Sequence, residues 1–250
     1  MTPTRQRFAD VVRASPVDVG LAALLVGAEV EPTLDVDESL AQLDALAAAA
    51  QPLVRELGPV RGLRQALAEF AGTADDFSDL RSSLLPEVLR RRRGLPLLLC
   101  VVWVEVAHRL GLTASYATVP GRVVVVLGDL EDEHAVVDAF SGGDVVDAVL
   151  PLGPDELLLR LLTNIRALTE RLPPSLEVAR TRLWAVELSL LLPIRPAALR
   201  RERGELLVRL GSFLDGAEEL ESYAEGVERA DPDAAEACRR SARQARARLN

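Results

Sequence analysis

Apolar residues recur every three or four positions through most of the chain, and this spacing predicts a mostly helical protein. Before residue 94, the spacing predicts helices beginning at Thr4 and at residue 35 or 37, and helices over 16–28, 60–70 and 80–93. Pro16 suits an early helical position, and Gly72 ends a periodic run. A further helix over 96–110 follows, with Pro96 in its first turn.

The spacing changes between residues 113 and 137. Three runs rich in β-branched residues, 114–119, 123–127 and 135–137, predict strands. The links between them are short, and parallel strands would need a long crossover. We therefore expect a small antiparallel sheet.

Helical spacing returns after residue 154 and continues through the rest of the chain. It predicts five helices, over 155–172, 175–192, 196–210, 216–229 and 233–249. Short turns that contain proline or glycine join them, which indicates antiparallel helix pairs. The sequence thus predicts an α+β fold that is mostly helical, with one domain over 1–152 and a helical domain over 153–250.

Composition and charge narrow the possible functions. Apolar residues make up 49% of the chain, enough for a sizeable core, and the net charge is -9. A basic surface for nucleic acid is therefore not expected. The local basic clusters at 90–93 and 239–248 are interpreted as solvated helix ends or partner surfaces.

Cys100 and Cys238 are the two cysteines, far apart in sequence, so no disulfide framework is predicted. No apolar run reaches the 18 or more residues that span a bilayer, and the first residues lack an apolar signal core. These features predict a cytoplasmic protein without membrane association.

Two histidines without paired spacing predict no metal site. Gly142-Gly143 lacks a following Lys-Ser or Lys-Thr, so no phosphate loop and no cofactor are expected.

The helices after residue 196 carry a repeat-like pattern of small and large residues. It consists of Gly204, Leu207, Leu210-Gly211, Phe213, Gly216 and Tyr223. Small residues at such positions allow the close helix crossing of a tetratricopeptide unit. An ordinary antiparallel helix pair is the alternative interpretation.

Several short motifs, read together, resemble the SirB-type transglutaminase-like proteins over roughly residues 30 to 230. These motifs are Asp76-Phe77, Ser83-Leu84-Leu85, Val88-Leu89, Arg92-Arg93-Gly94-Leu95-Pro96, Val106-Ala107-His108-Arg109-Leu110-Gly111-Leu112, Val119-Pro120-Gly121, Val137-Asp138-Ala139-Phe140-Ser141-Gly142-Gly143, Arg160-Leu161-Leu162-Thr163-Asn164-Ile165 and Arg203-Gly204. The resemblance implies a helical N-terminal region, a papain-like transglutaminase core and tetratricopeptide-like helices.

In active relatives of that core, a cysteine opens the central helix, a histidine lies on one strand and an aspartate on the next. The thiolate attacks an acyl group, the histidine carries the proton and the aspartate orients the imidazole. The resemblance places the nucleophile at Pro96 and the histidine at Arg122, and only Asp138 of the three is retained. Proline has no nucleophile, and a guanidinium is no base near neutral pH.

Cys100, His134 and Asp138 form the rival triad. Cys100 lies four residues after Pro96, on the same helix face but about 6 Å along the axis. His134 and Asp138 share one strand, roughly 13 Å apart. A cysteine in so apolar a run is more typical of a small buried residue than of a nucleophile.

Arg122 and Asp138 carry a further hypothesis, because the resemblance puts them on adjacent strands where histidine and aspartate would meet. We expect a partly buried ion pair, and the alternative is an Arg122 that points to solvent.

Three functions follow from this sequence. The favoured one is a catalytically inactive transglutaminase-like protein that binds a protein or peptide partner as an interaction or scaffold module. The second is a thiol-dependent acyl transferase or peptidase that uses Cys100 with His134. The third is a regulatory protein that affects gene expression through protein partners.

Overall fold

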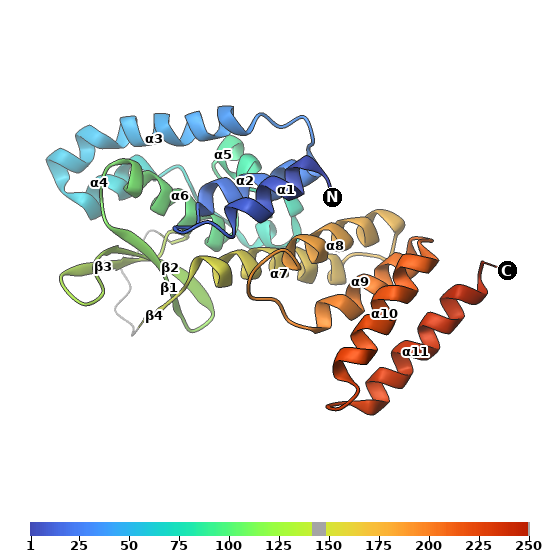
Figure 1. The fold of residues 1–250 in the computed structure, drawn as a ribbon. Helices are drawn as coiled ribbons and strands as arrows, with labels where there is room; N and C mark the ends of the chain where they lie inside the picture. The colour runs from blue at the N-terminus through green and yellow to red at the C-terminus, as the bar shows by residue number, and fades with distance from the viewer. Residues whose placement is uncertain (142–148, 250) are drawn as a thin grey trace. The chain divides into compact units, whose positions relative to one another are not determined.

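The computed structural model of the chain describes residues 1–141 and 149–249 and shows helices with one small sheet (Figure 1). The chain forms two compact units, Met1–Leu161 and Leu162–Asn250. The expected boundary at 152/153 lies just before helix α7, Pro154–Arg171, whereas the two units divide within that helix. The domain boundary at 152/153 therefore stays a prediction.

The first unit contains most of the described non-helical structure and the start of α7. Before α7 its helices are α1 Pro3–Val11, α2 Val19–Val30, α3 Val36–Leu57, α4 Pro59–Ala66, the 3-10 helices η1 Ala74–Ser78 and η2 Leu80–Ser83, α5 Leu85–Arg91 and α6 Pro96–Arg109.

Aspartate caps decide where two of these helices begin. The Asp18 carboxylate accepts a hydrogen bond from the Leu21 N–H at 2.8 Å, and Asp35 accepts one from the Glu38 N–H at 3.0 Å. Such caps satisfy N–H groups that have no partner within the helix. The predicted start at Pro16 was therefore wrong for α2, which begins at Val19.

The helix predicted over 80–93 is two pieces. The Asp79 side chain caps the first, η2, and Leu84 with extended backbone separates it from α5. Arg92 then adopts a left-handed conformation with φ of 52°, which ends α5 before the four arginines are complete. Left-handed backbone cannot continue a right-handed helix.

The sheet is antiparallel with the order β3-β2-β1-β4, which confirms the predicted pairing. Its strands are β1 Ala114–Val119, β2 Arg122–Gly128, β3 His134–Val137 and β4 Leu150–Pro151. The pattern missed β4 because two residues are too few to show an alternation.

Helix α6 lies between the sheet and α3 (Figure 1). Every residue from Leu97 to Ala107 is buried, because α2, α3 and α5 and two strands all pack on this helix. A helix that is apolar on all sides is typical of the centre of a domain. The opposite face of the sheet is buried too, with Ala117, Val124 and Val126 in its core cluster.

The second unit has helices as its only regular elements among its described residues. After α7 its helices are α8 Leu176–Ser189, α9 Ala198–Arg209, α10 Phe213–Val227 and α11 Pro232–Ala247. Leucine, valine and alanine side chains pack α8 on α9, and mostly alanines pack α10 on α11. Helices α9 and α10 cross at Gly204 and Gly216, where a Cβ on Gly204 would lie 3.0 Å from the Gly216 carbonyl oxygen.

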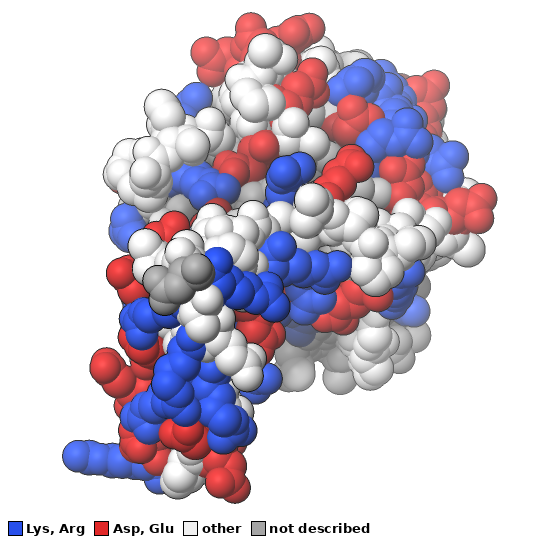
Figure 2. All heavy atoms as spheres, turned by 90° about the vertical axis from the view of Figure 1, so that its right-hand side faces the viewer, with Lys and Arg blue, Asp and Glu red and all other residues white. Residues whose placement is uncertain are grey.

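Basic and acidic side chains alternate over much of the face displayed in Figure 2. Many charged side chains of the described residues form ion pairs, including Arg243 with Glu236 at 2.8 Å on α11. The arginines of α11 thus do not act as isolated charges. No helix in the described ranges combines the length and the apolar character needed to cross a bilayer.

Replacing Gly216 with alanine should destabilise the second unit. The added Cβ would lie 2.9 Å from both the Gly204 carbonyl oxygen and the Val208 nitrogen, and backbone atoms cannot move away cheaply. We expect a loss of about 1–3 kcal/mol in the free energy of unfolding, measured by urea denaturation followed by circular dichroism.

Gly226→Ala is the matched control, because it lies in the same helix and a Cβ there meets nothing within 4 Å. This variant should gain about 0.5–1 kcal/mol from its higher helix propensity. Equal stability of the two variants would contradict the close crossing of α9 and α10.

Candidate functional site

The carboxylate of Asp76 is the buried polar centre of the loop that precedes α6. Its Oδ2 accepts hydrogen bonds from the Thr73 N–H at 2.7 Å and the Thr73 hydroxyl at 3.1 Å. Its Oδ1 accepts one from the Ser82 hydroxyl at 2.6 Å and one from Arg93 Nε at 3.0 Å. The Asp76 side chain itself is 0% exposed.

These donors keep Asp76 ionised. Burial alone would raise the pKa of the carboxyl, but the hydrogen bonds from Arg93, Ser82 and Thr73 together outweigh it and hold the pKa well below its ordinary value. Asp76 is therefore an anion that three segments surround.

Backbone hydrogen bonds connect the same segments to the start of α6. The Ala71 N–H donates to the Arg92 carbonyl at 3.1 Å and the Gly94 N–H donates to the Ala71 carbonyl at 3.2 Å, a parallel bridge. The Leu95 N–H donates to the Ser82 carbonyl at 2.9 Å. Together with Asp76, these bonds set the position of Pro96, the first residue of α6.

Phe140 brings the segment after β3 to this same place. A Cβ on Gly72 would lie 2.1 Å from the Phe140 ring and 2.6 Å from the Gly94 carbonyl oxygen, so the ring fills the space that glycine leaves. The ring also packs edge-on against Phe77, with 6.4 Å between centroids. Phe77 remains 48% exposed.

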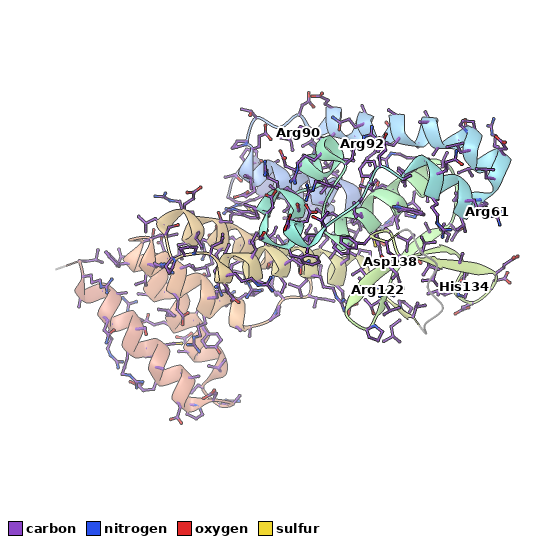
Figure 3. All side chains as sticks on the ribbon, turned by 180° about the vertical axis from the view of Figure 1, so that it is seen from behind. Arg61, Arg90, Arg92, Arg122, His134 and Asp138 are labelled. Atoms are coloured by element: carbon purple, nitrogen blue, oxygen red, sulfur yellow. The ribbon has the colours of Figure 1, made fainter. Side chains whose placement is uncertain are left out.

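Asp138, two residues earlier, meets Arg122 as expected. Arg122 Nε lies 3.6 Å from Asp138 Oδ2, and Figure 3 shows the two side by side. Asp138 Oδ1 also accepts the Phe140 N–H at 2.9 Å and the Ser141 N–H at 3.4 Å. The Asp138 side chain is 11% exposed and that of Arg122 is 46% exposed, so burial falls mainly on the carboxylate.

Cys100 lies one helical turn after Pro96 and is fully buried. Its Sγ donates to the Val123 carbonyl at 3.5 Å. Burial raises the pKa of the Cys100 thiol, the Asp138 carboxylate raises it further, and the Ala139 N–H opposes this only in part. The thiol is therefore close to Asp138 but protonated and inaccessible, the opposite of a reactive cysteine.

His134 lies at the other end of β3, opposite Gly128 in the sheet. It is exposed, and its Nδ1 bonds to the Asp132 carbonyl at 2.9 Å. Figure 3 shows it apart from Asp138, as four residues of extended strand, about 13 Å, require. The structure thus brings Cys100 and Asp138 together but not His134.

A comparison with known families matches residues 37–167 to the model of the transglutaminase-like superfamily. The chain belongs to the transglutaminase-like superfamily. The match covers α3 to α7 and hence every residue of the site described above.

The transglutaminase-like chain is also similar to curated proteins named UPF0162. Proteins of Xylella fastidiosa strains 9a5c and Temecula1 are 33% identical over 175 residues, which cover 62% of this chain and 62% of each relative. A UPF0162 protein of Pseudomonas aeruginosa is 33% identical over 134 residues, 48% of this chain and 47% of its own. The names of these relatives state no activity.

Among its described residues, the transglutaminase-like site places no histidine beside Cys100. Position 96 is proline, and Asp138 faces a guanidinium that accepts no proton near neutral pH. Groups of three or more His, Cys, Asp or Glu suited to a metal ion are absent from the described ranges. Gly142 and Gly143, the end of the sequence motif, lie outside the described residues.

Sequence reasoning missed a second buried carboxylate of the transglutaminase-like unit. Glu105 accepts hydrogen bonds from the Gly20 N–H at 3.1 Å and from Arg109 Nη1 at 2.6 Å, and Arg109 Nε donates to Asp44 at 2.7 Å. This network joins α2, α3 and α6. The sequence feature that could have predicted this network is a glutamate inside an apolar run, with an arginine four residues later on the same helix face.

Asp76→Asn should destabilise the protein at pH 7 by about 3 kcal/mol, because Arg93 and Ser82 lose a charged partner. The sign of the pH dependence follows from a lowered pKa in the folded state. Such a carboxylate contributes stability that is full above the pKa of the unfolded chain, near 3.8, and decreases below it. Urea midpoints measured from about pH 5 to pH 2 should fall more steeply for wild type than for the variant.

Asp75→Asn provides the control. Asp75 is the residue before Asp76, its carboxylate is exposed, and the chemical change is the same. It should leave the midpoint at pH 7 and its pH dependence close to those of wild type. If both variants change the urea midpoint and its pH dependence equally, the buried Asp76 carboxylate does not stabilise the loop more than an exposed one does.

Asp138→Ala should lower the free energy of unfolding by about 1–3 kcal/mol, because the Phe140 N–H loses its acceptor as well as the ion pair. Arg122→Gln should lower it by about 0–1 kcal/mol, since the guanidinium is half exposed and solvent screens the pair. Calorimetric unfolding measures both. Losses of equal size would mean that the ion pair, rather than the turn, accounts for the role of Asp138.

Proposed function

We propose that this chain is a catalytically inactive transglutaminase-like protein that acts as an interaction or scaffold module for a protein partner. One observation supports the proposal: Arg122 pairs with Asp138 at 3.6 Å, and these are the two positions where the resemblance expects the histidine and the aspartate. Pro96, at the position expected for the nucleophile, agrees with it.

Acyl transfer at such a site needs three groups in contact. A thiolate must attack, an imidazole must carry the proton and a carboxylate must orient the imidazole. Only the carboxylate is present, and its oxygens bind Arg122 and two backbone N–H groups. In this proposal the three catalytic groups are therefore incomplete, although the turn that holds the Asp138 carboxylate is intact.

The competing proposal, an enzyme that uses Cys100 with His134, has less support. Cys100 is 0% exposed and its thiol pKa is raised, while His134 bonds to Asp132 at the far end of the strand. A thiolate would have to form without solvent access and without a nearby imidazole.

We also propose that the relation is to the SirB-type branch of the superfamily and that the second unit is tetratricopeptide-like. The reciprocal approach at Gly204 and Gly216 supports the latter, because a tetratricopeptide pair crosses closely at such positions. In this proposal, the helical unit and the surface around Phe77 are the partner-binding surfaces. Aromatic side chains exposed to solvent are enriched where proteins bind one another.

The catalytic half of the proposal is tested by thiol labelling. Cys100 should resist iodoacetamide in the folded protein at pH 7, since each unit of raised pKa reduces the thiolate fraction about tenfold. Pro96→Cys should introduce a thiol that reacts readily, because residue 96 is partly exposed and begins a helix, which lowers a thiol pKa. Mass spectrometry of digests measures both rates.

Ala48→Cys is the control, an exposed thiol in the middle of α3 without a helix N-terminus. It should react more slowly than the thiol introduced at position 96. Selective alkylation of Cys100 in the folded wild type, with an acyl-transfer activity that Cys100→Ala abolishes, would replace this proposal by the enzyme.

The interaction half is tested by a photo-crosslinking phenylalanine analogue at position 77. It should form an adduct with a protein partner in cells that contain the chain, because the native ring is 48% exposed beside Phe140. The same analogue at Leu57, 38% exposed at the end of α3, is the control. Equal labelling from both positions, or from neither, would count against a partner at this surface.

A further inference from the structure

A pocket of about 270 Å³ lies in the second unit where the connection from α8 to α9 meets the C-terminal end of α10. The helices α8, α9 and α10 are labelled in Figure 1. The connection contributes Arg195 and Pro196, α9 contributes Arg200, and α10 contributes Ser222, Tyr223 and Gly226. The pocket is therefore built from residues of one unit.

Two arginines line this pocket and no acidic residue does. The chain as a whole has a net charge of -9. The first turn of α9 also carries no acidic side chain. The pocket is thus locally positive within an acidic protein.

The hydrogen-bond partners of the two arginines leave most of their donors available. Arg195 Nη1 donates to the Leu190 carbonyl at 3.0 Å, and no carboxylate pairs with Arg195 among the described residues. Arg200 Nη1 donates to the Ser222 hydroxyl at 3.3 Å and lies 3.8 Å from Glu219, close to the limit for an ion pair. A guanidinium carries five N–H donors in a planar fork that matches carboxylate and phosphate oxygens.

Other arginines of the same unit differ from these two. Arg166 and Arg182 both bind Glu202, and Arg203 binds Glu187 at 3.1 Å and Glu219 at 2.6 Å. The guanidiniums of these three arginines join helices, and the glutamates neutralise their charge. Arg195 and Arg200 have a positive charge that is only partly balanced.

Apart from Ser222, the remaining lining of the pocket is mostly apolar. Leu190, Pro196 and Val227 line it, and Tyr223 adds a ring. Apolar walls with a few convergent polar groups are typical of small-ligand sites. The volume equals about nine water molecules, which suits a ligand smaller than a nucleotide.

We propose that this pocket binds a small organic anion, a carboxylate or phosphate group on a short aliphatic body. The charged group interacts with Arg195 and Arg200, and the aliphatic body packs against Pro196 and Val227. This site is independent of the degenerate site of the first unit.

The test is calorimetric titration of the full chain at low ionic strength with hexanoate, with butyl phosphate and with neutral hexanamide. At least one of the two anions should bind and the amide should not, because charge provides the main attraction. Arg195→Gln and Arg200→Gln should each weaken binding about tenfold or more. Arg209→Gln, the same charge change at the exposed end of α9, should have no such effect.

Gly226→Leu tests the position of the site without changing charge. A Cβ at Gly226 meets nothing within 4 Å, so a leucine there should occupy the pocket while the unfolding midpoint stays at or above that of wild type. Binding should then be lost. Undetectable binding of both anions, equal binding of the amide, or affinities unchanged in the three pocket variants would overturn the proposal.

Discussion

The ionised carboxylate of Asp76 is the interaction on which the arrangement of the first unit depends. It lies at 0% exposure among donors from Thr73, Ser82 and Arg93. Burying a charge is costly unless it is paired and hydrogen-bonded, so Asp76 couples the three segments that supply its donors. The last of these segments leads directly into α6.

The position of α6 in turn determines what the rest of the site can be. Phe140 fits against Gly72 and the Gly94 carbonyl only because residues 71–72 and 93–94 run side by side. That contact holds the turn of Asp138 near Cys100 and Arg122. The geometry of a transglutaminase-like site is therefore supported by packing and by loop hydrogen bonds, neither of which needs a nucleophile or a base. The fold of this region therefore does not depend on which residues stand at positions 96 and 122.

Arginine supplies all 29 basic residues of the chain, and the structure uses its planar fork in several ways. Arg93 donates to the buried carboxylate, Arg92 stacks on the Phe70 ring at 5.3 Å, and Arg203 joins two glutamates in the second unit. An ammonium group could bind at these places only as a point charge. Arginines of the clusters at 90–93 and 239–248 are paired with carboxylates as well, among them Arg93 with Asp76 and Arg243 with Glu236.

The sequence by itself predicted most of the helices and strands and one contact of the site. Periodicity predicted α6 and three strands, because apolar spacing follows directly from which side of an element is buried. It also predicted that Arg122 and Asp138 would meet, from a resemblance rather than from spacing. It did not separate η2 from α5, since that break depends on the conformations of Leu84 and Arg92. Only the tertiary structure decided that Asp76 is a buried centre and that Glu105 joins α2 to α6. Each of these depends on atoms far apart in the chain whose distance sets burial and hydrogen bonding, and local sequence carries no record of that distance.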